Sequence, residues 1–358
     1  MMNTSQKLIA LLSGAALLSV SSLAAQTATT TPVGYVSFTL PENSDLKVGL
    51  PMQSGKSFSG AVSSVTAGSV TVGTTVPDLT TDVHFLLVTS DNGLLGHWYT
   101  ITGATGSTIS VAEDLAAAGL TSADTVCAVK FWTLDTLFPN GGAIPQSPDP
   151  FSPVAQVLLN DVNSVGVNLT PTAAYAYYDG LAGGDAGWLD AADPGAGYKG
   201  STLINPETFL IIRNGSGPSA DIVMSGGVPT EPIASSVLSR SAGAQDSLVF
   251  NPFPSAISLG NSELISSGAV RQSPDPFSPV DVLLLFDENS TGLNNTPVAS
   301  YVYYDGVAGG DAGWLDAADP GAGYKDANTI PAGAPMLIRR TAGADELITW
   351  VPALPYSL

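Results

Sequence analysis

The chain of 358 residues contains a single cysteine, Cys127, so no disulfide can form within it. The fold must therefore be held together by the burial of apolar side chains. Cys127 lies in the apolar run TVCAVKFWTL, where we expect a packed thiol rather than a reactive one. The only histidines are His84 and His97, and no Ser-His-Asp, Cys-His or multi-histidine pattern accompanies them. The sequence thus predicts a protein that is not an enzyme of the common nucleophilic kinds.

Basic residues are also scarce, since 11 Lys and Arg stand against 31 Asp and Glu and give a net charge of −20. Nucleic-acid binding depends on the neutralisation of phosphates by Lys and Arg, so we expect no nucleic-acid partner. Charged residues of both signs make up only 12% of the chain, while apolar residues make up 44%. This apolar content is typical of a folded protein and not of a disordered one.

Long apolar runs are missing after the N-terminal region, where none approaches the roughly 20 residues of a membrane-spanning helix. Residues 1–24 have the pattern of a secretory signal peptide: Lys7, then the apolar stretch Leu8–Val20, then small residues at Ser22 and Ala24. We expect cleavage after Ala24 and no integral membrane segment in the mature chain. The predicted location is secreted, extracellular or on the cell surface, with the periplasm as an alternative.

What the sequence does contain is an internal repeat. The segment Tyr175–Lys199 returns 126 positions later as Tyr301–Lys325, and the block QSPDPFSPV occurs identically at Gln146–Val154 and at Gln272–Val280. Self-similarity at a fixed offset indicates a duplicated structural unit. The repeat begins near Phe131, because Phe131–Ile144 aligns at the same offset with the segment before the second block.

Short runs rich in Val, Ile, Thr and aromatic residues, separated by Gly, Asn and Asp, predict an all-β fold of antiparallel strands. The one helical pattern is Glu113–Gly119, which ends at a glycine. We predict a small N-terminal β domain followed by two homologous antiparallel β modules, each a sandwich or a barrel. The predicted boundaries are 32–130 for the first domain, 131–232 for the first module and 233–358 for the second.

The repeated loops are rich in aspartate, and their carboxylates could have either of two roles. Calcium prefers six to eight oxygen ligands, often from Asp in glycine-rich loops. Alternatively, Asp in such loops accepts hydrogen bonds from its own local backbone and stabilises turns. The spacing matches no known calcium loop, so calcium is a candidate cofactor rather than an implied one. The candidate ligands are Asp179, Asp185, Asp190 and Asp193, with Asp305, Asp311, Asp316 and Asp319 in the second copy.

The aromatic residues of the repeat also have two interpretations. Large aromatics fill small β cores, but an exposed ring can stack on the apolar face of a sugar. The candidate sugar platforms are Trp188 and Tyr178 in the first copy and Trp314 and Tyr304 in the second. We expect the tryptophan in the glycine-rich stretch to be the exposed member. The near-identity of the two loops Gly183–Gly197 and Gly309–Gly323 reflects either a recent duplication or a shared ligand.

Three stretches carry a resemblance to a known family: TTTPVGYVSFTLP, FWTLDTLFP, and the C-terminal VLLLFDENSTGLNNTPVASYVYYDG with AGAPMLIRR. Together they resemble uncharacterised secreted β-rich proteins of Verrucomicrobia, in which a signal peptide precedes a PVG(F/Y)V opening. The matching residues include Phe286, Asp287, Gly292, Asn294, Tyr301, Tyr303, Tyr304, Trp314 and Ile338 to Arg340. The resemblance implies a secreted protein and supplies no activity or ligand. The loop around Trp314 is longer here than in that family.

These observations favour a non-catalytic structural or adhesive protein of the cell surface or extracellular matrix. One alternative is a carbohydrate-binding protein with two similar sites, whose partner would be a glycan or a component of the cell envelope. Another is a surface protein stabilised by calcium. The sequence does not predict an oligomeric state.

Overall fold

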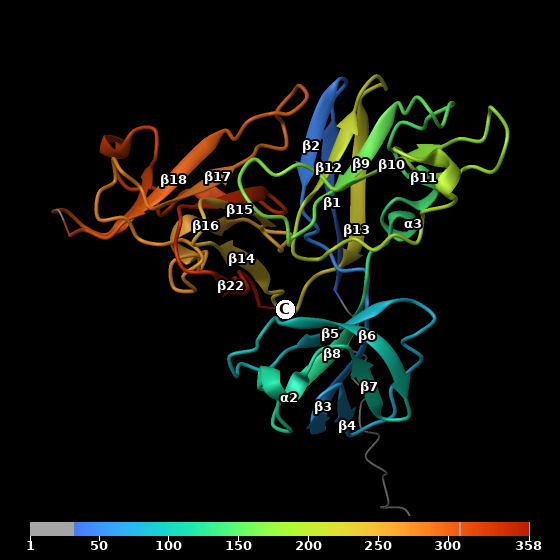
Figure 1. The fold of residues 1–358 in the computed structure, drawn as a ribbon, viewed down its shortest axis with the longest axis horizontal. Helices are drawn as coiled ribbons and strands as arrows, with labels where there is room; N and C mark the ends of the chain where they lie inside the picture. Colours follow the sequence, from blue (N-terminus) through green and yellow to red (C-terminus); the bar gives the residue numbers. More distant parts are fainter. Residues whose placement is uncertain (1–31, 308, 358) are drawn as a thin grey trace, which may run out of the picture. The chain divides into compact units, whose positions relative to one another are not determined.

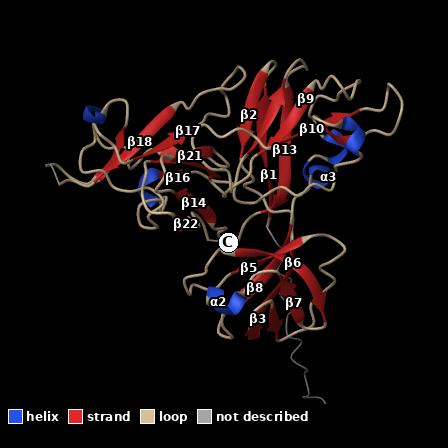
Figure 2. Cartoon of the chain, in the orientation of Figure 1, coloured by secondary structure: helices blue, strands red, loops and turns tan. Residues whose placement is uncertain are grey.

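The computed structural model describes residues 32–307 and 309–357, and the predicted signal peptide lies outside this range. The described chain is almost entirely β, as predicted (Figures 1 and 2). Its two short α-helices are α2 (Leu115–Ala118) and α3 (Leu134–Leu137). The first confirms the predicted helical segment: the carboxylate of Asp114 accepts a hydrogen bond from the Ala117 N–H, and Gly119 ends the helix with φ of 102°. Among the described residues, no helix is long and apolar enough to cross a membrane.

Six strands close into an antiparallel barrel in the order β3-β4-β7-β6-β5-β8. The interior is filled by small and branched apolar side chains, among them Val70, Leu86 and Ile109, none of which is exposed. Period-two alternation in the strands places these residues inward and the Ser and Thr residues outward. The strands are β3 (Lys56–Thr66), β4 (Ser69–Val72), β5 (His84–Val88), β6 (Trp98–Thr105), β7 (Thr108–Val111) and β8 (Thr125–Lys130).

The first module consists of a five-stranded antiparallel sheet, β11-β10-β9-β12-β2, and a two-stranded sheet, β1-β13. Figure 1 shows β2 beside β12, which also pairs with β9, although β2 is far from both in the sequence. The strands are β1 (Val33–Leu40), β2 (Ser44–Val48), β9 (Ala155–Leu159), β10 (Ala173–Tyr178), β11 (Gly187–Asp190), β12 (Leu210–Asn214) and β13 (Ala220–Gly227).

The second module repeats this topology, with the five-stranded sheet β19-β18-β17-β21-β15 and the two-stranded sheet β14-β22. A short pair, β16-β20, is added. The prediction of two homologous antiparallel modules is therefore confirmed. The strands are β14 (Ser235–Ser239), β15 (Gln245–Phe250), β16 (Ile257–Ser258), β17 (Asp281–Leu285), β18 (Ala299–Tyr304), β19 (Gly313–Asp316), β20 (Thr329–Ile330), β21 (Pro335–Arg340) and β22 (Glu346–Trp350).

The predicted N-terminal boundary of the first domain, residue 32, is wrong. Strands β1 and β2 do not belong to the barrel but pair with β13 and β12 of the first module, with Val33 opposite Gly227 and Ser44 opposite Asn214. The barrel is thus an insertion into the first module, between β2 and α3. The chain enters and leaves it at neighbouring points, because the N–H of Lys130 donates to the carbonyl of Gly55 at 2.9 Å. Local patterns in the sequence cannot reveal pairing across such a separation.

Each module contains an ion pair to which a loop of the other module adds hydrogen bonds. In the first, Arg213 on β12 donates Nε and one terminal nitrogen to the carboxylate of Asp45 on β2, each at 2.8 Å. Asp45 is buried, and it also accepts a hydrogen bond of 2.7 Å from the main-chain N–H of Asn294 in the second module. The Asn294 side-chain oxygen in turn accepts from Arg213 at 2.7 Å.

The reciprocal set repeats these contacts with the modules exchanged. Arg339 on β21 donates two hydrogen bonds of 2.8 Å to the buried Asp246 on β15. Asp246 also accepts a hydrogen bond of 2.7 Å from the N–H of Asn168 in the first module. Such reciprocity is the pattern of an isologous, two-fold interface. The two modules of one chain therefore contact each other in the way that two copies of a homodimer would.

Candidate functional site

An exposed phenylalanine stands at the same place in both modules. Phe151 and Phe277, from the identical blocks QSPDPFSPV, are each 79% exposed. The rest of the block has structural duties: in the second copy the buried Ser273 accepts a hydrogen bond from the Val280 N–H at 2.9 Å, and Asp275 accepts from the Phe277 N–H at 2.9 Å. These contacts hold a turn whose tip presents the phenyl ring to solvent, and packing does not account for the ring itself.

In the second module this ring lies at the rim of an open hollow of about 500 Å³. A volume of this size is typical of ligand sites. Every described residue that lines it has a counterpart of the same type 126 positions earlier, in the first module. The lining residues are Asp275, Pro276, Phe277, Tyr304, Gly309, Leu315, Pro320, Gly321, Gly323 and Tyr324.

Two tyrosine side chains also line the hollow. The Tyr324 ring is 48% exposed, and its hydroxyl donates to the carbonyl of Asp311 at 2.5 Å and accepts from the Asp311 N–H at 2.8 Å. Tyr304 is buried, and its hydroxyl donates to the carbonyl of Gly309 at 2.8 Å. Both hydroxyls are therefore used to fix the Gly-rich loop, while the half-exposed Tyr324 ring lines the same hollow as Phe277.

The first module holds the corresponding tyrosine differently. Tyr198 is 59% exposed, and its hydroxyl donates to the carboxylate of Asp135 on α3. The pKa of Tyr198 is raised to about 12. Burial of the hydroxyl is the largest cause, and its hydrogen bond with Asp135 adds to the effect. Asn261 occupies the position equivalent to Asp135 in the second module. The equivalent residues of the two modules are therefore of the same types, but one ring is anchored differently.

The predicted sugar platforms are contradicted by burial. Trp188 and Trp314 are 0% and 1% exposed, and each packs edge-to-face on a core tyrosine, Tyr177 or Tyr303, at 5.5 Å between ring centroids. A fully buried indole has no free face for a ligand, so the expectation that this tryptophan is exposed is wrong.

The other two predicted platforms are also buried. Tyr178 is 4% exposed and Tyr304 is 5% exposed, so neither presents a ring face to solvent. Tyr304 nevertheless lines the wall of the hollow. The exposed rings are those of Phe151 and Phe277 and, in part, those of Tyr198 and Tyr324. The identical QSPDPFSPV blocks single out Phe151 and Phe277 in the sequence, but they do not show that the rings are exposed.

Five of the eight repeated aspartates accept hydrogen bonds within turns. One carboxylate oxygen accepts a hydrogen bond from an N–H two residues later at Asp179, Asp190, Asp305, Asp316 and Asp319, over 2.8 to 3.2 Å. For Asp185 and Asp311 the structure places the residues in the exposed Gly-rich loops, and Asp193 precedes a short 3₁₀ turn. Within residues 32–307 and 309–357, no three His, Cys, Asp or Glu side chains converge as metal ligands do. Calcium binding at these loops stays a prediction.

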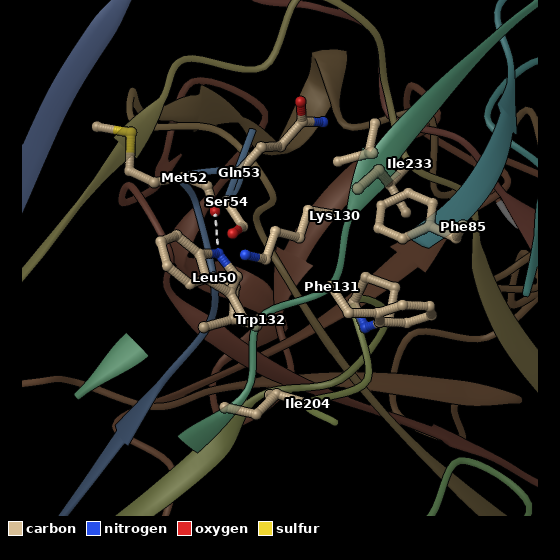
Figure 3. Close-up of a pocket in the computed structure, with 12 residues that line it drawn as sticks. Leu50, Met52, Gln53, Ser54, Phe85, Lys130, Phe131, Trp132, Ile204 and Ile233 are labelled. Atoms are coloured by element: carbon tan, nitrogen blue, oxygen red, sulfur yellow. Dashed lines mark hydrogen bonds between the residues drawn. The ribbon is translucent and has the colours of Figure 1, made fainter. Parts of the chain in front are cut away.

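Other cavities lie between parts of the described chain. The first, between the barrel and the first module, measures about 20 Å³ and is lined mainly by apolar residues such as Phe85, Phe131 and Ile233 (Figure 3). A cavity of this size has room for about one water molecule and not for a ligand. Trp132, drawn beside it, donates its indole N–H to the carbonyl of Met52 at 2.9 Å.

The second is an open groove of about 610 Å³ along the interface of the two modules. It is lined by the Arg213–Asp45 ion pair, by Arg339 of the reciprocal pair, and by Lys47, Asn295 and Phe286. Three of the 11 basic residues of the chain, Lys47, Arg213 and Arg339, therefore lie along one groove.

A scan against protein-family models found no match, and searches of curated proteins and of solved structures found no similar chain.

Proposed function

We propose that the protein is a secreted, non-catalytic adhesive protein that binds a neutral extracellular glycan through two equivalent sites, the hollow of the second module and the matching residues of the first. The observation that carries the proposal is the pair of exposed rings, Phe151 and Phe277, at the same position of two modules, with Phe277 and the half-exposed Tyr324 lining one hollow. The secretion part rests on the signal-peptide pattern of residues 1–24 and on the family resemblance.

The chemistry of the hollow suits a sugar. Exposed aromatic faces attract the C–H groups on the apolar face of a pyranose, and neighbouring carboxylate and carbonyl oxygens accept hydrogen bonds from its hydroxyls. Asp275 uses one oxygen on the Phe277 N–H and keeps further lone pairs for such bonds. The described lining residues comprise one carboxylate and no histidine, cysteine or lysine, which favours binding over catalysis.

Charge selects the class of glycan. A net charge of −20 repels polyanions such as uronate-rich or sulfated polysaccharides, and few cations are present to offset this. Neutral polysaccharides escape that repulsion. Two similar sites on one chain would also raise the apparent affinity for a polymer, because the second site binds at a high effective concentration.

The test is binding of the purified protein to neutral polysaccharides, for example xyloglucan, mixed-linkage β-glucan and galactomannan, by affinity electrophoresis or calorimetry. Replacing both Phe151 and Phe277 by Ala removes both platforms. A loss of about 1–1.5 kcal/mol at each site corresponds to roughly tenfold weaker binding. Each single variant should retain one site and bind with intermediate apparent affinity.

The matched control is the double variant Leu181→Ala with Val307→Ala. These side chains are 81% and 79% exposed, are related by the same repeat, and do not line the hollow. Their loss should leave binding and stability unchanged. Wild-type binding by the double phenylalanine variant, or the absence of binding to any polysaccharide tested, would contradict the proposal.

A further inference from the structure

Lys47 reaches across the module interface to a single asparagine. Its Nζ donates to the main-chain carbonyl of Asn295 at 2.9 Å and also contacts the side-chain Oδ1 of the same residue. Lys47 lies on β2 of the first module, and Asn295 lies in the loop after β17 of the second. The amine of one module is therefore held directly beside the carboxamide of the other.

The carboxamide is oriented by a second contact. The Asn295 Nδ2 donates to the main-chain carbonyl of Asp45 at 2.8 Å, which turns the amide nitrogen away and leaves the carbonyl side toward Lys47. The Phe286 ring covers the amine, with 4.5 Å between Nζ and the ring centroid. Both Lys47 and Asn295 are half-buried, so water has restricted access to the pair.

We propose that Lys47 and Asn295 join in an intramolecular amide bond between Nζ and Cγ, with release of ammonia. The neutral amine attacks Cγ and forms the new C–N bond. A proton then passes from the attacking nitrogen to the amide nitrogen of Asn295, the original C–N bond breaks, and that nitrogen leaves as ammonia. The step consumes no oxidant or cofactor, and every atom is accounted for.

The surroundings favour this chemistry. Burial lowers the pKa of Lys47 to about 8, so a larger share of the amine is neutral and nucleophilic near neutral pH than for an exposed lysine. The charge of Arg213 acts in the same direction, and that of Asp45 opposes it. Asp45 lies two residues from Lys47 on the same face of β2, and its main-chain carbonyl holds the Asn295 amide, so the reacting pair is fixed by the same strand.

The two-fold relation of the modules supplies an internal comparison. On the other side of the interface, Leu248 occupies the position of Lys47, Leu169 that of Asn295, and Asn160 that of Phe286. The fold therefore tolerates two leucines at the equivalent positions. Packing alone does not require a lysine and an asparagine there. A chain with one cysteine also has no intramolecular disulfide to tie its modules together.

The test is mass analysis of the purified full-length protein after digestion. We expect a peptide in which the Lys47 and Asn295 segments are joined, with a mass lower by one ammonia than the sum of the two. Lys47→Arg keeps the charge and Asn295→Ala removes the electrophile, and neither protein should yield the linked peptide. Both should also migrate more slowly than the wild type in denaturing electrophoresis and melt at a lower temperature.

The linked peptide is the decisive measurement, because succinimide formation elsewhere in the chain also releases ammonia. If the wild-type digest yields only the two separate peptides with Asn295 intact, the pair is merely hydrogen-bonded and the proposal is overturned. This outcome is independent of glycan binding, which involves neither residue.

Discussion

At the scale of single residues, Glu207 connects all three parts of the described chain. Its carboxylate accepts a hydrogen bond from the Trp98 indole of the barrel at 2.8 Å and another from the Ser236 N–H of the second module at 2.9 Å, while Glu207 itself belongs to the first. Burial raises the pKa of Glu207, and the hydrogen bonds from Ser236 and Trp98 partly oppose this. The junction therefore holds a carboxylate that is costly to ionise in the folded state.

The raised pKa predicts a pH dependence with a definite sign. The folded state keeps a proton on Glu207 at pH values where the unfolded chain, with its ordinary value of 4.5, has released it. The contribution to stability is therefore full below the unfolded pKa and is lost as pH rises through the folded one. We expect the stability of the wild type relative to Glu207→Gln, measured by urea unfolding, to fall as pH rises.

The Trp98→Phe variant provides the check on this assignment. It removes a hydrogen bond that favours the ionised form, so the decline relative to Glu207→Gln should extend to higher pH. A difference between wild type and Glu207→Gln that stays constant with pH would contradict the assignment.

The residues of the repeat show where sequence analysis succeeds and fails at this scale. The repeat and the turn role of its aspartates could be predicted from spacing and residue type. The exposure of the aromatics could not, since Trp188 and Phe151 differ in burial because of the elements packed on them. Size and apolar character favour burial for both, and only the three-dimensional structure shows that Phe151 is left outside.

At the scale of elements, each module contacts the other through a loop that contains a short repeated pattern, Gly-x-Asn. Gly166 and Gly292 have φ of 106° and 94°, and Asn168 and Asn294 have φ of 55° and 53°. Glycine and asparagine tolerate this left-handed region better than other residues. The conformation directs the Asn N–H of each loop to the buried aspartate of the other module.

Loss of one such aspartate should therefore weaken the module pair. Asp246→Ala leaves Arg339 without its carboxylate and the Asn168 N–H without its acceptor. We expect the free energy of unfolding to fall by about 3 kcal/mol. This is at the low end for a broken buried ion pair, because the guanidinium can still reach water. The measurement is urea unfolding of the full-length protein.

The exposed Asp185→Ala serves as the control and should change the stability by no more than about 0.5 kcal/mol. Adding Arg339→Met to Asp246→Ala should recover part of the loss, because it removes the unpaired charge. Equal stability of Asp246→Ala and the control would show that the docking contact contributes little.

Strand pairing sets the limit of prediction at this scale. The strands β9, β10, β11 and β12 and their copies could be predicted from local alternation and from the repeat. The partners of β1 and β2 could not, because the duplicated hairpin, β14 and β15, has drifted beyond recognition apart from residues such as Asp45 and Asp246. The matching ion pairs of Asp45 and Asp246 show that β2 and β15 are equivalent strands, which the sequence alone does not reveal.

At the scale of the whole molecule, the barrel is an insertion into a two-module unit. Asp45 and Asp246 are 201 positions apart, whereas Arg213 and Arg339 are 126 apart, and the barrel accounts for the difference. The equivalent strands of the second module are continuous without it. Insertions of this kind are tolerated where the ends of the inserted unit lie close together.

This arrangement predicts that the barrel can be removed. Replacing Lys56–Val129 by a short Gly-Ser linker between Gly55 and Lys130 spans two residues that are already hydrogen-bonded at 2.9 Å. We expect a folded two-module protein with an unchanged β spectrum in circular dichroism. Its melting temperature should fall, because Phe131 and Ile233 lose their partners Phe85 and Val129. Each large side chain that is uncovered should lower the free energy of unfolding by about 1.5–3 kcal/mol.

The functional consequences separate the roles of the parts. The proposed glycan sites and the Lys47–Asn295 pair lie outside the barrel, so the shortened protein should bind polysaccharide as the full chain does and should contain the same linked peptide. A second version with Phe131→Thr and Ile233→Thr limits aggregation through the uncovered surface. If both versions are unfolded, the barrel is part of the folding unit and not an insertion into an independent pair of modules.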